Sequence, residues 1–283
     1  MVRYILAAIL AGSLVGSVAP RSAAAADAHA TPTPPRQKWS FSGPFGKFDQ
    51  GQLQRGFRVY KEVCATCHGL NLLSIRNLGD PGALGYSEAQ IKALAAEYRV
   101  QDGPNDQGEM FERPGRPADR FPAPFPNDAA ARIRYNAVPP DLSVMAKART
   151  YERGFPWFVF DMVTQYQEQG VDYLAAFLTG YVDKPADVTI PQGLQYNKYF
   201  PGGATAMPKP AQLYSQLVQY DDGTPTTPEQ YAKDVSAFLM WTAEPHMEAR
   251  KRIGFQVMIF LIVLAGLLYF TKKKVWSGIK DHA

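Results

Sequence analysis

The stretch Cys64-Ala65-Thr66-Cys67-His68 restricts the fold of this 283-residue chain more than any other part of its sequence. Two thiols separated by two residues can bond to the two vinyl groups of one haem, and the imidazole that follows can then reach the iron. We therefore expect one covalently attached haem c on Cys64 and Cys67, with His68 as an iron ligand. Around this motif we expect a mainly α-helical, loop-rich domain.

Disulfide exchange and zinc binding use the same Cys-x-x-Cys spacing. A zinc site lacks ligands, because the chain has only two cysteines and four histidines, and the other histidines lie near the chain ends or beside an apolar segment. A thioredoxin-like exchanger needs strands alternating with helices around the pair, whereas the sequence downstream is rich in proline. The remaining non-redox alternative is a colourless binding domain closed by a Cys64-Cys67 disulfide.

The second axial position of a haem iron is commonly a methionine in high-potential electron carriers. Met207 follows a stretch that contains Gly202 and Gly203 and precedes Pro208, and glycines let a backbone approach a flat cofactor closely. Met110 lies in a charged stretch, and the other methionines lie at the chain start, in expected helices or at an apolar segment. The residues alone leave three alternatives: Met207, Met110, and an open or histidine-ligated iron.

The start of the chain predicts export. Arg3 precedes an apolar run at 4–18, and small residues at 22–26 offer a cleavage site. Fifteen apolar residues are too few to span a bilayer comfortably, and Pro20 interrupts the run. We therefore interpret residues 1–26 as a signal peptide.

A second apolar segment predicts a membrane anchor near the other end. Residues 253–270 contain no charge and lie between cationic clusters at 250–252 and 272–274. A helix of this length measures about 27 Å, close to the hydrocarbon core of a bilayer, and a buried core helix rarely has cations at both ends. The expected division is an exported haem domain at 27–249, a transmembrane anchor at 250–272 and a cytoplasmic tail at 273–283.

Charge is divided unevenly along the chain. The formal net charge is +4, yet residues 27–249 hold 21 of the 30 cations and 25 of the 26 acids, which makes that part −4. A mildly acidic domain argues against nucleic acid as a partner. It is compatible with a basic protein partner or with an ordinary solvated surface.

Two helices of the exported domain can be predicted from spacing. One begins after Asp49, carries Leu53, Phe57 and Tyr60 on one face, and runs to the first cysteine. The other covers residues 228–243, after a possible cap at Thr227. We expect these two helices to cross. Prolines between residues 104 and 140 predict long irregular loops there.

Segments beyond the Cys-x-x-Cys-His motif indicate a particular family. The chain resembles cytochrome c1, the haem subunit of the cytochrome bc1 complex, in its bacterial form. The segments that carry the resemblance are Arg55-Gly56-Phe57, Val100-Gln101-Asp102-Gly103-Pro104-Asn105, Glu109-Met110-Phe111, Pro139-Pro140-Asp141-Leu142-Ser143, Tyr199-Phe200-Pro201-Gly202, Asp221-Asp222-Gly223-Thr224-Pro225 and Ala243-Glu244-Pro245. They extend over almost the whole chain that follows the signal peptide.

The resemblance implies a class I c-type cytochrome-like domain with Met207 as the sixth iron ligand. It also implies that an arginine before Pro139 pairs with a haem propionate, which suits a planar guanidinium. The spacing to the prolines is one residue shorter here than in relatives, so Arg132 and Arg134 compete, and we favour Arg132. The stretch 150–173 is longer than in mitochondrial relatives and rich in aromatic residues.

The implied function is electron relay, with no catalytic site beyond the haem. One electron would pass from the Rieske iron–sulfur protein through the haem to a soluble or anchored cytochrome c, within a dimeric complex that also contains cytochrome b. The haem domain would lie on the periplasmic side of the bacterial inner membrane. Acids that can steer a basic cytochrome are Asp102, Asp106, Glu109 and Glu112. The alternative is a stand-alone membrane-anchored carrier or haem sensor.

Overall fold

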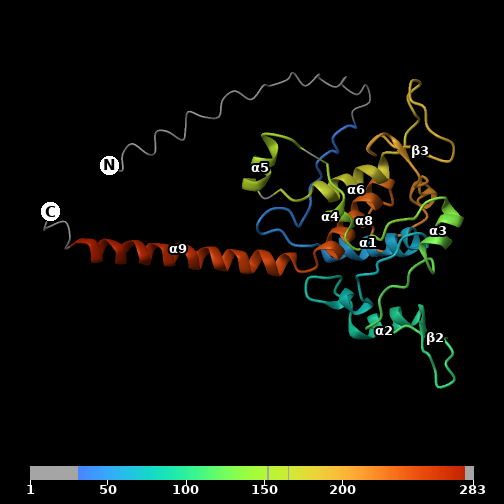
Figure 1. The fold of residues 1–283 in the computed structure, drawn as a ribbon, viewed down its shortest axis with the longest axis horizontal. Helices are drawn as coiled ribbons and strands as arrows, with labels where there is room; N and C mark the ends of the chain where they lie inside the picture. Colours follow the sequence, from blue (N-terminus) through green and yellow to red (C-terminus); the bar gives the residue numbers. More distant parts are fainter. Residues whose placement is uncertain (1–30, 152, 165, 278–283) are drawn as a thin grey trace, which may run out of the picture.

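The computed structural model describes residues 31–151, 153–164 and 166–277 (Figure 1). The predicted signal peptide at 1–26 lies outside these residues. Labels beginning with η mark short 3₁₀ helices. In chain order the elements are α1 (Gln50–Glu62), η1 (Cys64–Thr66), η2 (Ile75–Gly79), α2 (Glu88–Ala96), β1 (Arg99–Asp102), β2 (Phe111–Pro114), α3 (Asp128–Tyr135), α4 (Met145–Ala148), α5 (Trp157–Thr164), α6 (Gln169–Thr179), β3 (Gln195–Tyr196), β4 (Ala204–Thr205), α7 (Ala211–Tyr214), α8 (Pro228–Ala243) and α9 (Met247–Ser277).

Helices and long connections dominate the described part of the chain, as predicted. The strands form two small antiparallel sheets, β1 with β2 and β3 with β4. Figure 1 shows the helices of the domain gathered around α8, while α9 projects away from them as one long rod. The architecture is the mainly α, loop-rich domain with a long C-terminal helix that the sequence predicts.

Helix α1 begins where its sequence predicts. The Asp49 side chain accepts a hydrogen bond of 2.6 Å from the backbone N–H of Gln52, which satisfies one of the free donors of the first turn. Leu53, Phe57 and Tyr60 are buried on one face. The helix therefore presents this apolar face to the domain interior and delivers the chain to Cys64.

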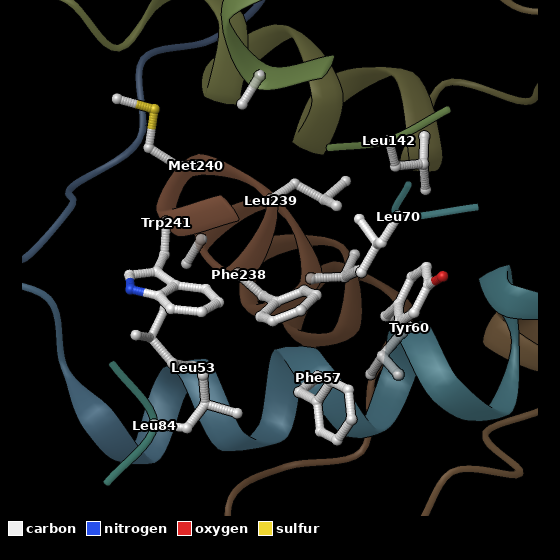
Figure 2. Packing of buried hydrophobic residues seen from close by; sticks show 14 of the residues in the cluster. Leu53, Phe57, Tyr60, Leu70, Leu84, Leu142, Phe238, Leu239, Met240 and Trp241 are labelled. Carbon is white, nitrogen blue, oxygen red and sulfur yellow. The ribbon is translucent and has the colours of Figure 1, made fainter. Parts of the chain in front are cut away.

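Helix α8 is the centre of the core, and α1, α4 and α6 pack on it. Its Thr227 cap accepts from the backbone of Gln230, as expected. Because the other helices surround it, α8 is buried on almost all sides from Tyr231 to Thr242. Figure 2 shows Leu53, Phe57 and Tyr60 of α1 facing the α8 side chains, among them Phe238 and Trp241.

Polar side chains complete the contact between α1 and α8. Asp234 is fully buried, and it accepts hydrogen bonds from Gln52 (3.1 Å), Arg55 (2.9 Å) and Gln230 (2.8 Å). A buried carboxylate is tolerated when donors surround it in this way. The predicted crossing of the two helices is confirmed.

The proline-rich stretch at 104–140 is less irregular than its composition predicts. Strands β1 and β2 form a hairpin with Arg99 opposite Pro114 and Asp102 opposite Phe111. Helix α3 follows, capped by Asn127, whose side chain accepts from the backbone of Ala130 at 2.9 Å. The prolines lie at strand ends and in the connections, where they break no ladder bond.

Helix α9 extends beyond the predicted apolar segment at both ends. Among the described residues it is the only helix long and apolar enough to cross a membrane. Its first turns are tied to the domain, because Lys251 donates a 2.6 Å bond to the carbonyl of Phe41, and Glu248 accepts one of 2.8 Å from the backbone of Phe48. Helix α9 is therefore a single-pass anchor, and two hydrogen bonds fix its first turns to the domain.

Candidate haem site

The two cysteines lie on one tight turn directly after α1. The backbone N–H groups of Cys67 and His68 both donate to the carbonyl of Cys64, at 3.1 and 2.9 Å. Both cysteines are free thiols. Burial, and then the charge of Cys67, raise the pKa of Cys64 to about 12, so this sulfur is a neutral thiol at neutral pH. The turn therefore presents two thiols and one imidazole within five residues.

His68 is buried, and its ring is oriented by a carbonyl far away in the sequence. Its Nδ1 lies 2.7 Å from the carbonyl oxygen of Pro140. A carbonyl can only accept, so Nδ1 carries the proton and Nε2 keeps its lone pair. Burial lowers the pKa of His68, against the opposing effect of the bond to Pro140. The result is a neutral imidazole, the form that binds a metal ion.

A strap formed by residues 139–143 holds the segment that follows His68. The Leu142 N–H donates to the carbonyl of Gly69 at 2.9 Å, and the Asn71 N–H donates to Asp141 at 2.7 Å. The N–H of the next residue donates to Ser143 at 3.1 Å. Three hydrogen bonds directly after the contact with Pro140 thus fix the chain that follows the imidazole.

Met207 lies in a second fixed loop. It follows β4, and its carbonyl accepts a 3.1 Å bond from the hydroxyl of Tyr181, while its N–H donates to Thr205 at 3.2 Å. Gly203, at φ +74°, lies so close to Tyr196 that an added Cβ would come within 2.7 Å of that ring. The methionine side chain is partly buried and packs against the main core.

Met110, the other methionine considered, has a different environment. It lies in the connection between β1 and β2, with 58% of its surface exposed. Figure 1 shows this hairpin projecting from the body of the domain, whereas β3 and α3 lie at the end of the domain opposite α9. Met207 is thus held by the core and Met110 is not.

Arg132 and Arg134 lie on α3, whose last residue, Tyr135, lies beside the turn at residues 64–68. We call this turn the haem-binding turn. The side chain of Cys67 raises the pKa of Tyr135, and that of Arg134 opposes this shift. Arg132 is exposed, and its guanidinium has no side-chain partner within the part of the chain that the structure describes. Through Tyr135 the end of α3 lies beside Cys67, and Arg134 contributes to the electrostatics of that tyrosine.

The sequence reasoning missed three participants of this site: the carbonyl of Pro140, the ring of Tyr135 and the hydroxyl of Tyr181. No spacing rule relates them to Cys64 or Met207, because they reach the site through tertiary folding. The proline-proline pair at 139–140 was the one available signal, since it marks a stiff segment.

The donor set fits a haem c. Two sulfur atoms lie on one turn, a neutral imidazole has its Nε2 lone pair available, and a partly buried thioether lies in a second fixed loop. The one other histidine in the described ranges 31–151, 153–164 and 166–277 is His246, which is exposed directly before α9.

The family model described as "Cytochrome C1 family" matches residues 39–279. The chain belongs to the cytochrome c1 family. Cytochrome c1 of Blastochloris viridis is 48% identical over 280 residues, which cover 98% of this chain and 97% of that protein. Cytochrome c1 of Rhodospirillum rubrum is 45% identical over 247 residues, covering 87% and 88%.

A fused relative is also similar. The cytochrome b/c1 protein of Bradyrhizobium diazoefficiens is 65% identical over 246 residues, which cover 86% of this chain and 36% of that protein. The chain therefore spans about a third of the length of this relative. As a cytochrome c1, the chain carries one covalently bound haem c.

Proposed function

We propose that this cytochrome c1 is the electron-transfer subunit of a quinol:cytochrome c oxidoreductase complex. Cys64 and Cys67 hold the haem through thioether bonds, and His68 and Met207 ligate its iron. The observation that carries the proposal is the 2.7 Å contact of His68 Nδ1 with the Pro140 carbonyl, beside two cysteines on one turn. It gives the imidazole the tautomer and orientation that an iron ligand needs.

The protein's part in electron transfer is to keep the site rigid and dry. The haem supplies the one-electron redox chemistry. His68 is neutral and buried, and the strap at 139–143 prevents its ring from turning. Hydrogen bonds hold both backbone polar groups of Met207, because its carbonyl accepts from Tyr181 and its N–H donates to Thr205. A rigid site needs little rearrangement when an electron arrives or leaves, and a thioether ligand favours the reduced iron.

We infer the electron route from the position of the site. The end of the domain that carries α3 and β3 lies opposite α9, and so away from the membrane (Figure 1). A soluble or anchored cytochrome c can approach this end, and the Rieske iron–sulfur subunit is the donor. Exposed acids on the nearby hairpin, namely Asp106, Glu109 and Glu112, favour a basic acceptor.

The remaining assignments are part of the same proposal. The signal peptide at 1–26 is removed, the haem domain at 27–249 faces the periplasm, and α9 spans the inner membrane with its tail in the cytoplasm. Arg132 pairs with a haem propionate, which its unengaged guanidinium supports. The subunit works beside cytochrome b in a dimeric complex.

Extraction of the membrane in a mild detergent tests the complex. We expect the chain to co-purify with a cytochrome b and an iron–sulfur subunit, and quinol to reduce its haem. Removal of the iron–sulfur subunit should abolish that reduction while the haem c still accepts electrons from a chemical reductant. If the chain comes away alone, with a haem that works without these subunits, it is a stand-alone anchored carrier or haem sensor and the proposal is wrong.

A further inference from the structure

Helix α5 exposes an unusual amount of apolar surface for a domain outside the hydrocarbon core. Six large apolar side chains are exposed on α5 and at the position two residues before it: Phe155, Trp157, Phe158, Val159, Phe160 and Met162. Phe155 is 82% exposed and Met162 72%. Contiguous exposed apolar side chains of this size mark a surface that a membrane or another molecule covers.

The exposed surface of α5 is held in place by the buried side chain of Asp161. Asp161 is buried, and it pairs with Arg153 and, at 3.7 Å, with Arg36. The guanidinium of Arg36 also lies 3.6 Å from the centre of the Tyr166 ring. Because two cations pair with the buried Asp161, α5 is fixed to the domain and its apolar side chains stay on the surface.

The segment that fixes α5 also touches the base of the membrane anchor. Five residues after Arg36, the carbonyl of Phe41 accepts the 2.6 Å bond from Lys251 of α9. Phe45, itself 71% exposed, packs edge-on against Phe255 of α9, with 5.4 Å between the ring centres. Along the direction of α9, Figure 1 shows α5 level with the first turns of that helix.

We propose that α5 lies in the lipid headgroup and acyl-chain boundary of the bilayer that α9 crosses, as a second contact with the membrane. The cations at 250–252 place the bilayer surface at the first turns of α9, which is the level of α5 and Phe45. Trp and Phe favour this boundary, and Arg153 and Arg36 lie on the inner side of α5 towards the domain. Lipid then covers one continuous apolar surface that consists of α5, Phe45 and the exposed side of α9.

Photolabelling from the lipid phase tests this contact on the assembled complex in its membrane. The probe is a phospholipid whose acyl chain carries a diazirine, and labelled peptides are mapped by mass spectrometry. We expect label on residues 155–162 as well as on α9. Ile133 of α3 is the internal control, because it is 88% exposed yet lies at the end of the domain away from α9. It should carry none.

A variant pair makes the test specific. Changing Phe158→Glu together with Phe160→Glu should remove the label from α5 and leave that on α9, whereas Ile133→Glu should change neither. Unchanged haem content shows that the variants fold. Label confined to α9 in the unchanged chain would overturn the proposal, and so would a protein crosslink from α5 to another subunit in place of lipid. Neither result affects the electron route, which does not depend on α5.

Discussion

Asp119 is the side chain that ties the β1–β2 hairpin to the body of the domain. It receives a bidentate pair of hydrogen bonds from Arg113, at 2.6 and 3.0 Å, and a third bond of 2.7 Å from the backbone of Arg116. Arg113 also binds Asp102 across the hairpin. The backbone carbonyl of Asp119 accepts from Ile75 at 3.0 Å, which links this network to η2.

This network predicts a loss of stability in acid. The hydrogen bonds from Arg113 lower the pKa of Asp119 to about 2, below the value of about 3.9 in an unfolded chain. Stabilisation by this carboxylate is complete above about pH 4 and is lost as the pH falls towards 2. Asp119→Asn should unfold at lower denaturant concentration at pH 7, and its difference from the unchanged chain should shrink between pH 4 and 2.

Denaturant titrations followed by circular dichroism at several pH values measure this difference. The matched control is Asp106→Asn, which changes an exposed acid of the same hairpin and should leave stability nearly unchanged. A stability difference for Asp119→Asn that stays constant from pH 7 to pH 2 would show that the carboxylate charge is not its source.

At this scale, the sequence predicts what is local. The spacing of Cys64, Cys67 and His68 predicts a haem site, and the structure places all three on one turn. The resemblance, and not spacing, singled out Met207. The Pro140 carbonyl could not be predicted, because it lies 72 positions after His68 in the sequence and reaches it only through tertiary folding. Tyr135 was missed for the same reason.

At the scale of elements, α1 and α8 approach each other closely at Gly56. A Cβ added there would lie 2.1 Å from the backbone carbonyl oxygen of Asp234 and 2.7 Å from Cβ of Phe238. Neither atom is the end of a flexible side chain. The glycine therefore sets the distance between the two helices that position the haem-binding turn.

Gly56→Ala should force α1 and α8 apart and destabilise the domain by about 1–3 kcal/mol, the usual cost of overpacking a core. Gly51→Ala is the matched control in the same helix, because its added Cβ would meet nothing closer than 3.4 Å. The better helix propensity of alanine should make this control neutral or more stable, by up to about 1 kcal/mol. Equal unfolding midpoints for the two variants, in the same denaturant titration, would contradict the close approach at Gly56.

The elements that could be predicted were those with strong apolar periodicity and caps. Helices α1 and α8 fall within a residue of their expected bounds. The β1–β2 hairpin was missed because side-chain pairs such as Arg113 with Asp102 stabilise it, and composition does not reveal such pairs. Helix α5 was seen only as an aromatic stretch, since its residues face outwards and no core periodicity marks them.

At the scale of the whole molecule, apolar surface and charged surface lie at different positions along the direction of α9. The apolar anchor and the exposed aromatic residues of α5 lie towards one end, and the haem-binding turn lies towards the other (Figure 1). The acids of the hairpin project from the body of the domain. In the proposed electron route, the end that would meet the acceptor thus lies in water, and the acids of the hairpin give it negative charge.

Neutralising Asp106, Glu109 and Glu112 to the corresponding amides should slow association with a basic cytochrome c. We expect roughly a tenfold fall in the second-order rate constant at low ionic strength, the lower end of electrostatic steering effects. The difference should vanish at high salt, where exposed charges are screened. Stopped-flow oxidation of the reduced haem measures the rate, and an unchanged rate at low salt would remove the steering idea.

The axial ligands of the iron test the central claim most directly. Near-infrared magnetic circular dichroism of the oxidised protein distinguishes histidine–methionine ligation from other pairs. The unchanged chain and the Met110→Leu control should both give the histidine–methionine signature. Met207→Leu should lose it, and the haem potential should fall by on the order of 0.1 V, a modest part of the ~0.8 V range that axial ligands control. Retention of the signature in Met207→Leu, or its loss in Met110→Leu, would contradict an iron held between His68 and Met207.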